Sequence, residues 1–96
     1  MTFQEFKERV STEERVAIST QLREFPIRFS YAGAFQLLTN EERGRIIQAA
    51  TLYCFVGTDT KFDDLYMSIM FELIKGDIDF DAYEQYEYNN NVIGGE

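Results

Sequence analysis

Residues 39–57 read TNEERGRIIQAATLYCFVG, and this stretch decides the fold class. Thr39 and Glu42 form a capping box, in which each side chain accepts a hydrogen bond from the backbone N–H of the other residue. The apolar residues that follow share one helix face: Ile46, Ile47, Ala50, Tyr53 and Cys54. Gly57 is placed to cap the C-terminal end. The stretch therefore predicts an amphipathic helix of about four turns.

Two further helices are expected before this one, because the same capping signature occurs twice more. Thr2 with Glu5 begins the first helix, and Ser11 with Glu14 begins the second. Their apolar positions are Phe3, Phe6 and Val10 in the first and Val16, Ile18, Leu22 and Phe25 in the second. Pro26 disfavours helical geometry in the residue before it, so the second helix should end there. Residues 27–38 fit either a helix or a short strand.

Two more helices are expected after Gly57. Asp63 is the expected cap of the first, which carries a wide apolar face and ends at Gly76. That face consists of Leu65, Tyr66, Ile69, Met70, Leu73 and Ile74. Asp77 or Asp79 should cap a last helix that runs to about Asn89, and residues 89–96 should fray.

These elements predict an all-α fold, a compact bundle of five or six short helices. Val and Ile are too sparse and scattered for a sheet. A chain of 96 residues is long enough for one hydrophobic core, so residues 1–96 should form a single helical domain. Neither a membrane-spanning apolar run nor a signal-peptide pattern occurs, which predicts a cytoplasmic protein. The single cysteine, Cys54, has apolar neighbours that favour a buried thiol.

The net charge of −8 belongs to one end of the chain. Residues 1–58 carry seven basic and seven acidic side chains, whereas residues 59–96 carry ten acidic side chains against only Lys61 and Lys75. Such asymmetry favours a surface that meets a cationic partner, because summed charge steers encounters between molecules. The low pI of about 4.4 argues against direct binding to nucleic acid.

Several kinds of chemistry are disfavoured by what the sequence lacks. Histidine is absent, which removes the commonest general base and metal ligand. Asp77, Asp79 and Asp81 resemble the start of a calcium-binding loop, but Ala82 and Tyr88 stand where such a loop needs Gly and Glu. We therefore expect no catalytic residues, no metal site and no cofactor.

Acidic and tyrosine side chains alternate along residues 77–88, and two interpretations of this pattern stay open. The tyrosines can be residues at the edge of the core, with the acids forming a solvated face. Alternatively, the segment is an interaction surface, in which carboxylates take the place of backbone phosphates and tyrosines act as anchors. The candidate partner-binding residues are Asp77, Asp79, Asp81, Tyr83, Glu84, Tyr86 and Glu87, with Asp63 and Asp64 as an extension of the patch.

Motifs in the second half of the chain carry a resemblance to known proteins. They are LTNEERG at 38–44, Ile46-Ile47, Ala49-Ala50, Tyr53, Gly57, FELIK at 71–75, Ile78-Asp79, and Tyr83 or Tyr86. In order and spacing, residues 35–86 resemble a family of small, uncharacterised helical proteins encoded by phages and prophages, often near replication genes. Residues 1–26 lie outside the resemblance. It implies a phage origin and a helical fold, and it assigns no reaction.

The leading hypothesis is a phage-encoded, non-enzymatic protein whose acidic, tyrosine-rich C-terminal region binds and inhibits a basic nucleic-acid-binding protein of the host or the phage. This hypothesis includes DNA mimicry against a bacterial defence nuclease such as a CRISPR effector. The alternative is a replication-accessory or homodimeric assembly protein that acts through an apolar surface. Phe3, Phe6 and Val10 would form that surface.

Overall fold

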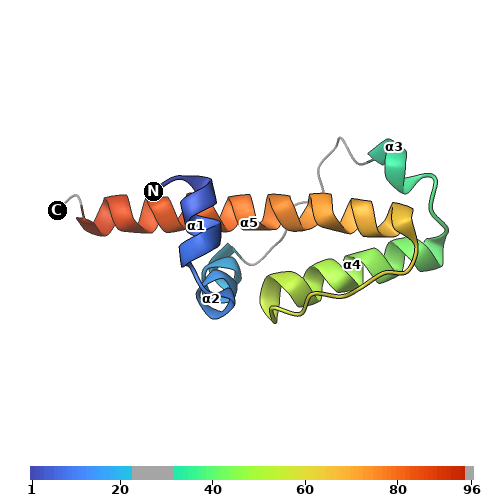
Figure 1. The fold of residues 1–96 in the computed structure, drawn as a ribbon, viewed down its shortest axis with the longest axis horizontal. Coiled ribbons are helices and arrows are strands. Elements are labelled where there is room, and N and C mark those ends of the chain that lie inside the picture. The colour runs from blue at the N-terminus through green and yellow to red at the C-terminus, as the bar shows by residue number, and fades with distance from the viewer. Residues whose placement is uncertain (23–31, 95–96) are drawn as a thin grey trace.

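The computed structural model describes residues 1–22 and 32–94, and within them the chain forms five helices and no strand (Figure 1). The helices are α1 (Phe3–Arg9), α2 (Thr12–Leu22), α3 (Ala32–Phe35), α4 (Asn40–Phe55) and α5 (Leu65–Gly94). The prediction of an all-α bundle is confirmed. The predicted stop at Pro26 lies outside the described residues, as do residues 27–31 of the segment that fitted either helix or strand. Its described part forms α3 and a turn.

Helices α4 and α5 run in the same direction, and both begin at the same end of the molecule (Figure 1). Near that end the Tyr66 hydroxyl donates to the backbone carbonyl of Ala34, and further along the Tyr53 hydroxyl donates to Asp79. Parallel neighbours need a connection as long as the helix itself. The 16 residues of α4 rise about 24 Å, and residues 56–64 can span about 30 Å when extended, so this return segment suffices.

The main core lies between α4 and α5, because each helix turns an apolar face towards the other. The buried cluster consists of Leu38, Ile46, Ala50 and Cys54 with Met67, Met70, Ile74 and Ile78. Phe62 of the return segment packs edge-on against Phe71, with 5.5 Å between ring centroids. The prediction of a buried Cys54 thiol is confirmed, and burial raises the pKa of this thiol.

The capping predictions at both ends of α4 are also confirmed. Thr39 and Glu42 form the expected capping box, as do Thr2 and Glu5 in α1. Gly57 has a φ angle of 92°, and its N–H donates to the Leu52 carbonyl over 2.8 Å. A Cβ atom at this position would lie 3.0 Å from Thr12, so glycine also allows α2 to approach closely.

The prediction of two helices over residues 63–89 is wrong, because α5 continues for 30 residues without a break. Ile74 and Ile78 flank Gly76 in sequence and are both buried in the main core, so a break would remove one of them from it. Gly76 itself is exposed, and a Cβ atom there would meet nothing within 4 Å. Asp64, rather than Asp63, caps the helix by accepting from the Met67 N–H. Residues 89–94, expected to fray, are helical.

Helices α1 and α2 pack across the C-terminal half of α5 (Figure 1). A second buried cluster forms there from Phe6, Ile18 and Ala82, with Phe3 and Val10 packed against it. The expectation that Phe3, Phe6 and Val10 form an exposed apolar surface is therefore wrong. The molecule measures 50 × 23 × 22 Å because α5 runs along its length. Among the described residues, no helix combines the length and the apolar character needed to cross a membrane.

Candidate functional site

Several of the candidate partner-binding residues face the N-terminal helices. The Tyr83 hydroxyl donates to the backbone carbonyl of Met1 over 2.8 Å, and the Tyr86 ring lies 5.4 Å from the Phe6 ring. Glu87 lies 3.5 Å from the amino group of Met1. The interpretation of the tyrosines as core-edge residues is thus confirmed for Tyr83 and Tyr86. These side chains hold α1 against α5.

Other candidates remain on the surface. Asp63 and Asp64 are exposed at the start of α5, and Glu84 is exposed about 30 Å further along the helix. Glu72, which the sequence did not single out, is exposed between them. We call these four residues the exposed acidic surface. In contrast, Asp77 and Asp81 are half-buried and have interactions within the chain.

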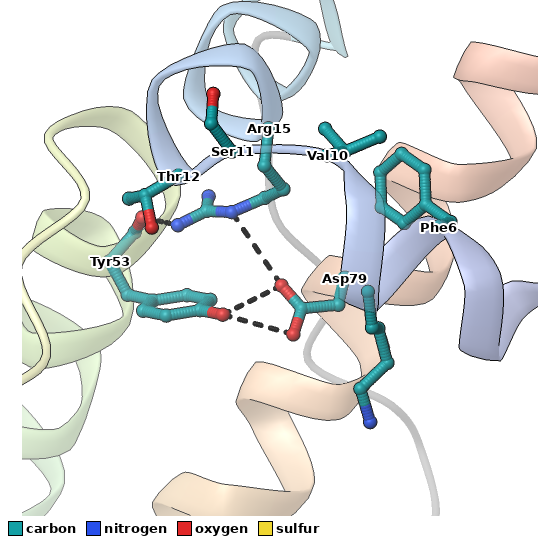
Figure 2. Close-up of a pocket in the computed structure, with 8 residues that line it drawn as sticks. Phe6, Val10, Ser11, Thr12, Arg15, Tyr53 and Asp79 are labelled. Atoms are coloured by element: carbon teal, nitrogen blue, oxygen red, sulfur yellow. Dashed lines mark hydrogen bonds and ion pairs between the residues drawn. The ribbon is translucent and has the colours of Figure 1, made fainter.

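The remaining candidate, Asp79, belongs to a polar cluster with Arg15 and Tyr53, shown in Figure 2. Arg15 on α2 is only 5% exposed. Its guanidinium group donates to the backbone carbonyl of Tyr53 over 2.6 Å and to that of Cys54 over 3.2 Å. These carbonyls belong to the last turn of α4, where carbonyl groups have no hydrogen-bond donor within the helix. Arg15 therefore supplies the donors that cap the end of α4.

The same guanidinium group also contacts α5. Its Nε atom lies 3.6 Å from the Asp79 carboxylate, and the group stacks over the Tyr53 ring at 4.1 Å from the centroid. The Tyr53 hydroxyl donates to both oxygens of Asp79, over 2.7 and 2.9 Å (Figure 2). Helices α2, α4 and α5 thus meet in one polar cluster, which we call the Arg15 cluster.

A pocket of about 140 Å³ opens beside this cluster, lined also by Phe6, Lys7, Val10, Ser11 and Thr12. Burial raises the pKa of Asp79, although the hydrogen bond from Tyr53 and the charge of Arg15 act in the opposite direction. Burial, together with the Asp79 hydrogen bond, raises the pKa of Tyr53 further above its ordinary value. The Tyr53 hydroxyl therefore stays protonated and donates hydrogen bonds to the Asp79 carboxylate. This geometry supports a structural role for the Arg15 cluster.

A second buried cation fixes the return segment. The Lys75 Nζ atom lies 2.8 Å from Asp59 and 2.7 Å from Glu72, and it stacks over the Phe71 ring. The hydrogen bond from Lys75 lowers the pKa of Asp59. Sequence reasoning missed both Lys75 and Arg15. The pattern that could have indicated a buried cation is a single basic residue within an otherwise apolar helix segment, such as Lys75 after Ile74.

A groove of about 250 Å³ lies at the end of the molecule where α4 and α5 begin. It is lined by Leu37, Leu38, Glu42, Asp64 and Tyr66. Of these residues only Asp64 was a candidate from the sequence. The others were missed because the groove depends on the parallel arrangement of α4 and α5, which no local pattern indicates.

The aspartates of the calcium-like motif lie within the continuous helix α5. Side chains two residues apart on a helix point about 200° away from each other, so Asp79 faces away from Asp77 and Asp81. Across residues 1–22 and 32–94, the structure brings together no group of three or more cysteine, aspartate or glutamate side chains that could hold a metal ion.

Comparison with known proteins connects most of this architecture to one family. Residues 24–90 match a family of unknown function (DUF6291). The matched stretch includes α3, α4 and most of α5, and it begins after α1 and α2. No curated protein and no solved structure matches the chain. Since the match covers well over half of the sequence, the chain belongs to the DUF6291 family.

Proposed function

We propose that this protein is a phage-encoded, non-catalytic interaction module whose exposed acidic surface binds a Lys/Arg-rich site on a nucleic-acid-binding protein and inhibits it. The observation that carries the proposal is the exposure of Asp63 and Asp64 just before α5 and of Glu72 and Glu84 on that helix, at the end of the chain that holds its entire net charge. The phage origin is supported by the resemblance of residues 35–86 to phage-encoded proteins.

The mechanism is competition for a site that normally holds nucleic acid. Carboxylates on α5 and in the two residues before it present negative charge over about 30 Å, as a phosphate backbone does. Complementary charge steers the two proteins together and speeds their association. The partner is a basic protein of the bacterial host or of the phage, and a defence nuclease such as a CRISPR effector fits this description. In this proposal the protein works in the bacterial cytoplasm as a DNA mimic.

The acidic side chains fall into two groups by their surroundings. Asp79 and Glu87 lie against cationic groups of the chain itself, in contact with Arg15 and the amino group of Met1. Asp63 and Glu84 are exposed, and so is Glu72, although it also lies 2.7 Å from the Lys75 Nζ atom. In the proposal, the charge of these three side chains acts on a partner. A variant that neutralises only the second group tests the function without removing the internal contacts of the first. Glutamine at position 72 keeps a side-chain oxygen that can accept a hydrogen bond from Lys75.

The test is affinity capture from bacterial lysate at low and at moderate salt, followed by mass spectrometry. Three proteins are compared: the wild type, the surface variant Asp63→Asn/Glu72→Gln/Glu84→Gln, and the control variant Glu8→Gln/Glu13→Gln/Glu41→Gln, which loses the same charge elsewhere. The wild type and the control should retain a basic nucleic-acid-binding protein at low salt and release it at moderate salt. Equal retention by the surface variant would contradict the proposal.

A second function, a replication-accessory or homodimeric assembly role, is favoured by one observation. Leu65 and Ile69 are 75% and 52% exposed, and Phe80 is exposed on the same side of α5. Light scattering of the wild type and of Ile69→Gln tests the homodimer. A wild-type dimer that becomes monomeric in the variant would support it, and a wild-type monomer at all concentrations would exclude it.

A further inference from the structure

The groove at the start of α5 combines apolar walls with two acids. Leu37 is 76% exposed and forms one wall, and the buried Leu38 also lines the groove. Tyr66 forms another wall, and its hydroxyl donates to the Ala34 carbonyl over 2.9 Å, which fixes the position of the ring. Glu42 and Asp64 complete the lining. The groove therefore presents apolar surface and negative charge together.

Both acids are held in place by the helices that they cap. One oxygen of Glu42 accepts from the Thr39 N–H over 2.8 Å, and one oxygen of Asp64 accepts from the Met67 N–H over 2.9 Å. These hydrogen bonds orient the carboxylates without neutralising their charge. Among the described residues that line the groove, none is basic. The complementary ligand is therefore a cation with an apolar stem.

The Arg15 cluster shows how this chain holds such a cation. There a guanidinium group stacks on the Tyr53 ring and lies beside the Asp79 carboxylate. The groove offers the same two kinds of group, an aromatic ring and a carboxylate, from Tyr66 and from the two capping acids. Exposed Leu37 adds an apolar wall for the methylene stem of a long cationic side chain.

We infer that the groove is an anchor site for an arginine side chain of the basic partner. The inference rests on the proposed function, because it assumes that the partner presents basic side chains. Arginine suits the site better than lysine, since its planar guanidinium group stacks on tyrosine and donates to carboxylates through several N–H groups at once. Exposed Leu65 and Ile69 extend the apolar surface along α5 beyond this anchor.

The test is an NMR titration of the full chain with N-acetyl-arginine methylamide, and with the citrulline analogue at matched ionic strength. Citrulline has nearly the same shape as arginine but no charge. With arginine, saturable shifts should appear at the amide signals of the residues that line the groove. With citrulline, binding should be at least about tenfold weaker, because a desolvated cation near an aromatic ring and a carboxylate gains about 1.4 kcal/mol or more.

The variant Glu42→Gln/Asp64→Asn removes both charges and keeps side chains that can form the same capping hydrogen bonds. It should fold normally and lose the arginine-dependent shifts, whereas the control Glu8→Gln/Glu13→Gln should keep them. Equal arginine-dependent shifts in the variant and the wild type, or equal shifts with arginine and citrulline, would overturn the inference.

Failure of this inference can be separated from failure of the proposed function. If capture yields the basic partner but the groove variant retains it as well as the wild type does and shows unchanged shifts, the anchor site is wrong and the acidic surface stands. If no basic protein is captured while arginine still binds in the groove, the proposed function is wrong and the site stands.

Discussion

The two attachments of α5 differ in chemistry. Its N-terminal half packs on α4 through a continuous apolar cluster that includes Ile46 and Ile74. Its C-terminal half holds α1 and α2 through aromatic rings and through the Arg15 cluster, in which directional polar contacts link three helices. Apolar packing is nondirectional, whereas a buried ion pair stabilises only when its geometry is complete. The comparison teaches that part of the acidic C-terminal end serves the fold itself.

The largest expected effect tests the apolar attachment. Ile74→Ala should lower the free energy of unfolding by about 4 kcal/mol, because a fully buried side chain is replaced by a cavity. Chemical denaturation followed by circular dichroism measures this difference. The matched control is Ile69→Ala on the exposed side of the same helix, where the change should stay below about 1 kcal/mol. Equal losses in the two variants would contradict the described packing.

The next effect tests the polar attachment. Arg15→Met should lower the free energy of unfolding by about 3 kcal/mol, since it leaves two carbonyl groups of α4 without their donor and the Asp79 carboxylate without its cation. Hydrogen exchange should quicken more in α2 than in α4. Arg9→Met, at a largely exposed ion pair with Glu5, should change stability by less than about 1 kcal/mol. If Arg15→Met unfolds no more readily than this control, the cluster does not hold α2.

Two glycines sharpen the comparison, because they have opposite environments. Gly57→Ala should destabilise the fold by about 2 kcal/mol, since its positive φ angle disfavours a side chain and Thr12 blocks the added Cβ atom. Gly76→Ala should stabilise it by about 1 kcal/mol, because alanine favours a continuous helix and the site has space. Thermal unfolding measures both. Destabilisation by Gly76→Ala would indicate that α5 breaks there.

The smallest effect is the pH dependence of the Arg15 cluster. Burial raises the pKa of Asp79 above 3.8, so the folded protein holds this proton more tightly than the unfolded chain does. The contribution of Asp79 to stability is therefore greatest below pH 3.8 and is lost as the pH rises through its folded pKa. Stability of the wild type relative to Asp79→Asn, measured by denaturation between acidic and neutral pH, should fall with rising pH. A rise would mean that the ion pair with Arg15 outweighs burial.

Local patterns in the sequence predicted what depends on near neighbours. The capping boxes at Thr2 and Thr39, the turn at Gly57 and the burial of Cys54 follow from spacing of a few residues. Gly76 matches a C-terminal helix cap at the end of an apolar face, but packing of its neighbours in the core overrides both that pattern and the low helix propensity of glycine. Propensity is a weak signal wherever both flanking turns are buried.

The candidate site depended on contacts that spacing does not reveal. The sequence predicts Asp79 as a partner-binding residue on the surface, yet Asp79 contacts Arg15 and Tyr53, which are 64 and 26 residues away in sequence. The groove likewise joins Leu37 to Tyr66, which requires the parallel order of α4 and α5. The overall acidity of residues 59–96 was visible at once, but its division into internal and exposed carboxylates required the arrangement of the helices.

The most direct test of the proposed function is a calorimetric titration of the purified captured partner at low salt. Three proteins are titrated: the wild type, the surface variant Asp63→Asn/Glu72→Gln/Glu84→Gln, and Asp79→Asn at a temperature where it is folded. The surface variant should bind about tenfold more weakly or worse, because it has lost negative charge that is complementary to the basic partner. Asp79→Asn should bind as the wild type does. Undiminished affinity of the surface variant, or a selective loss in Asp79→Asn, would contradict the account.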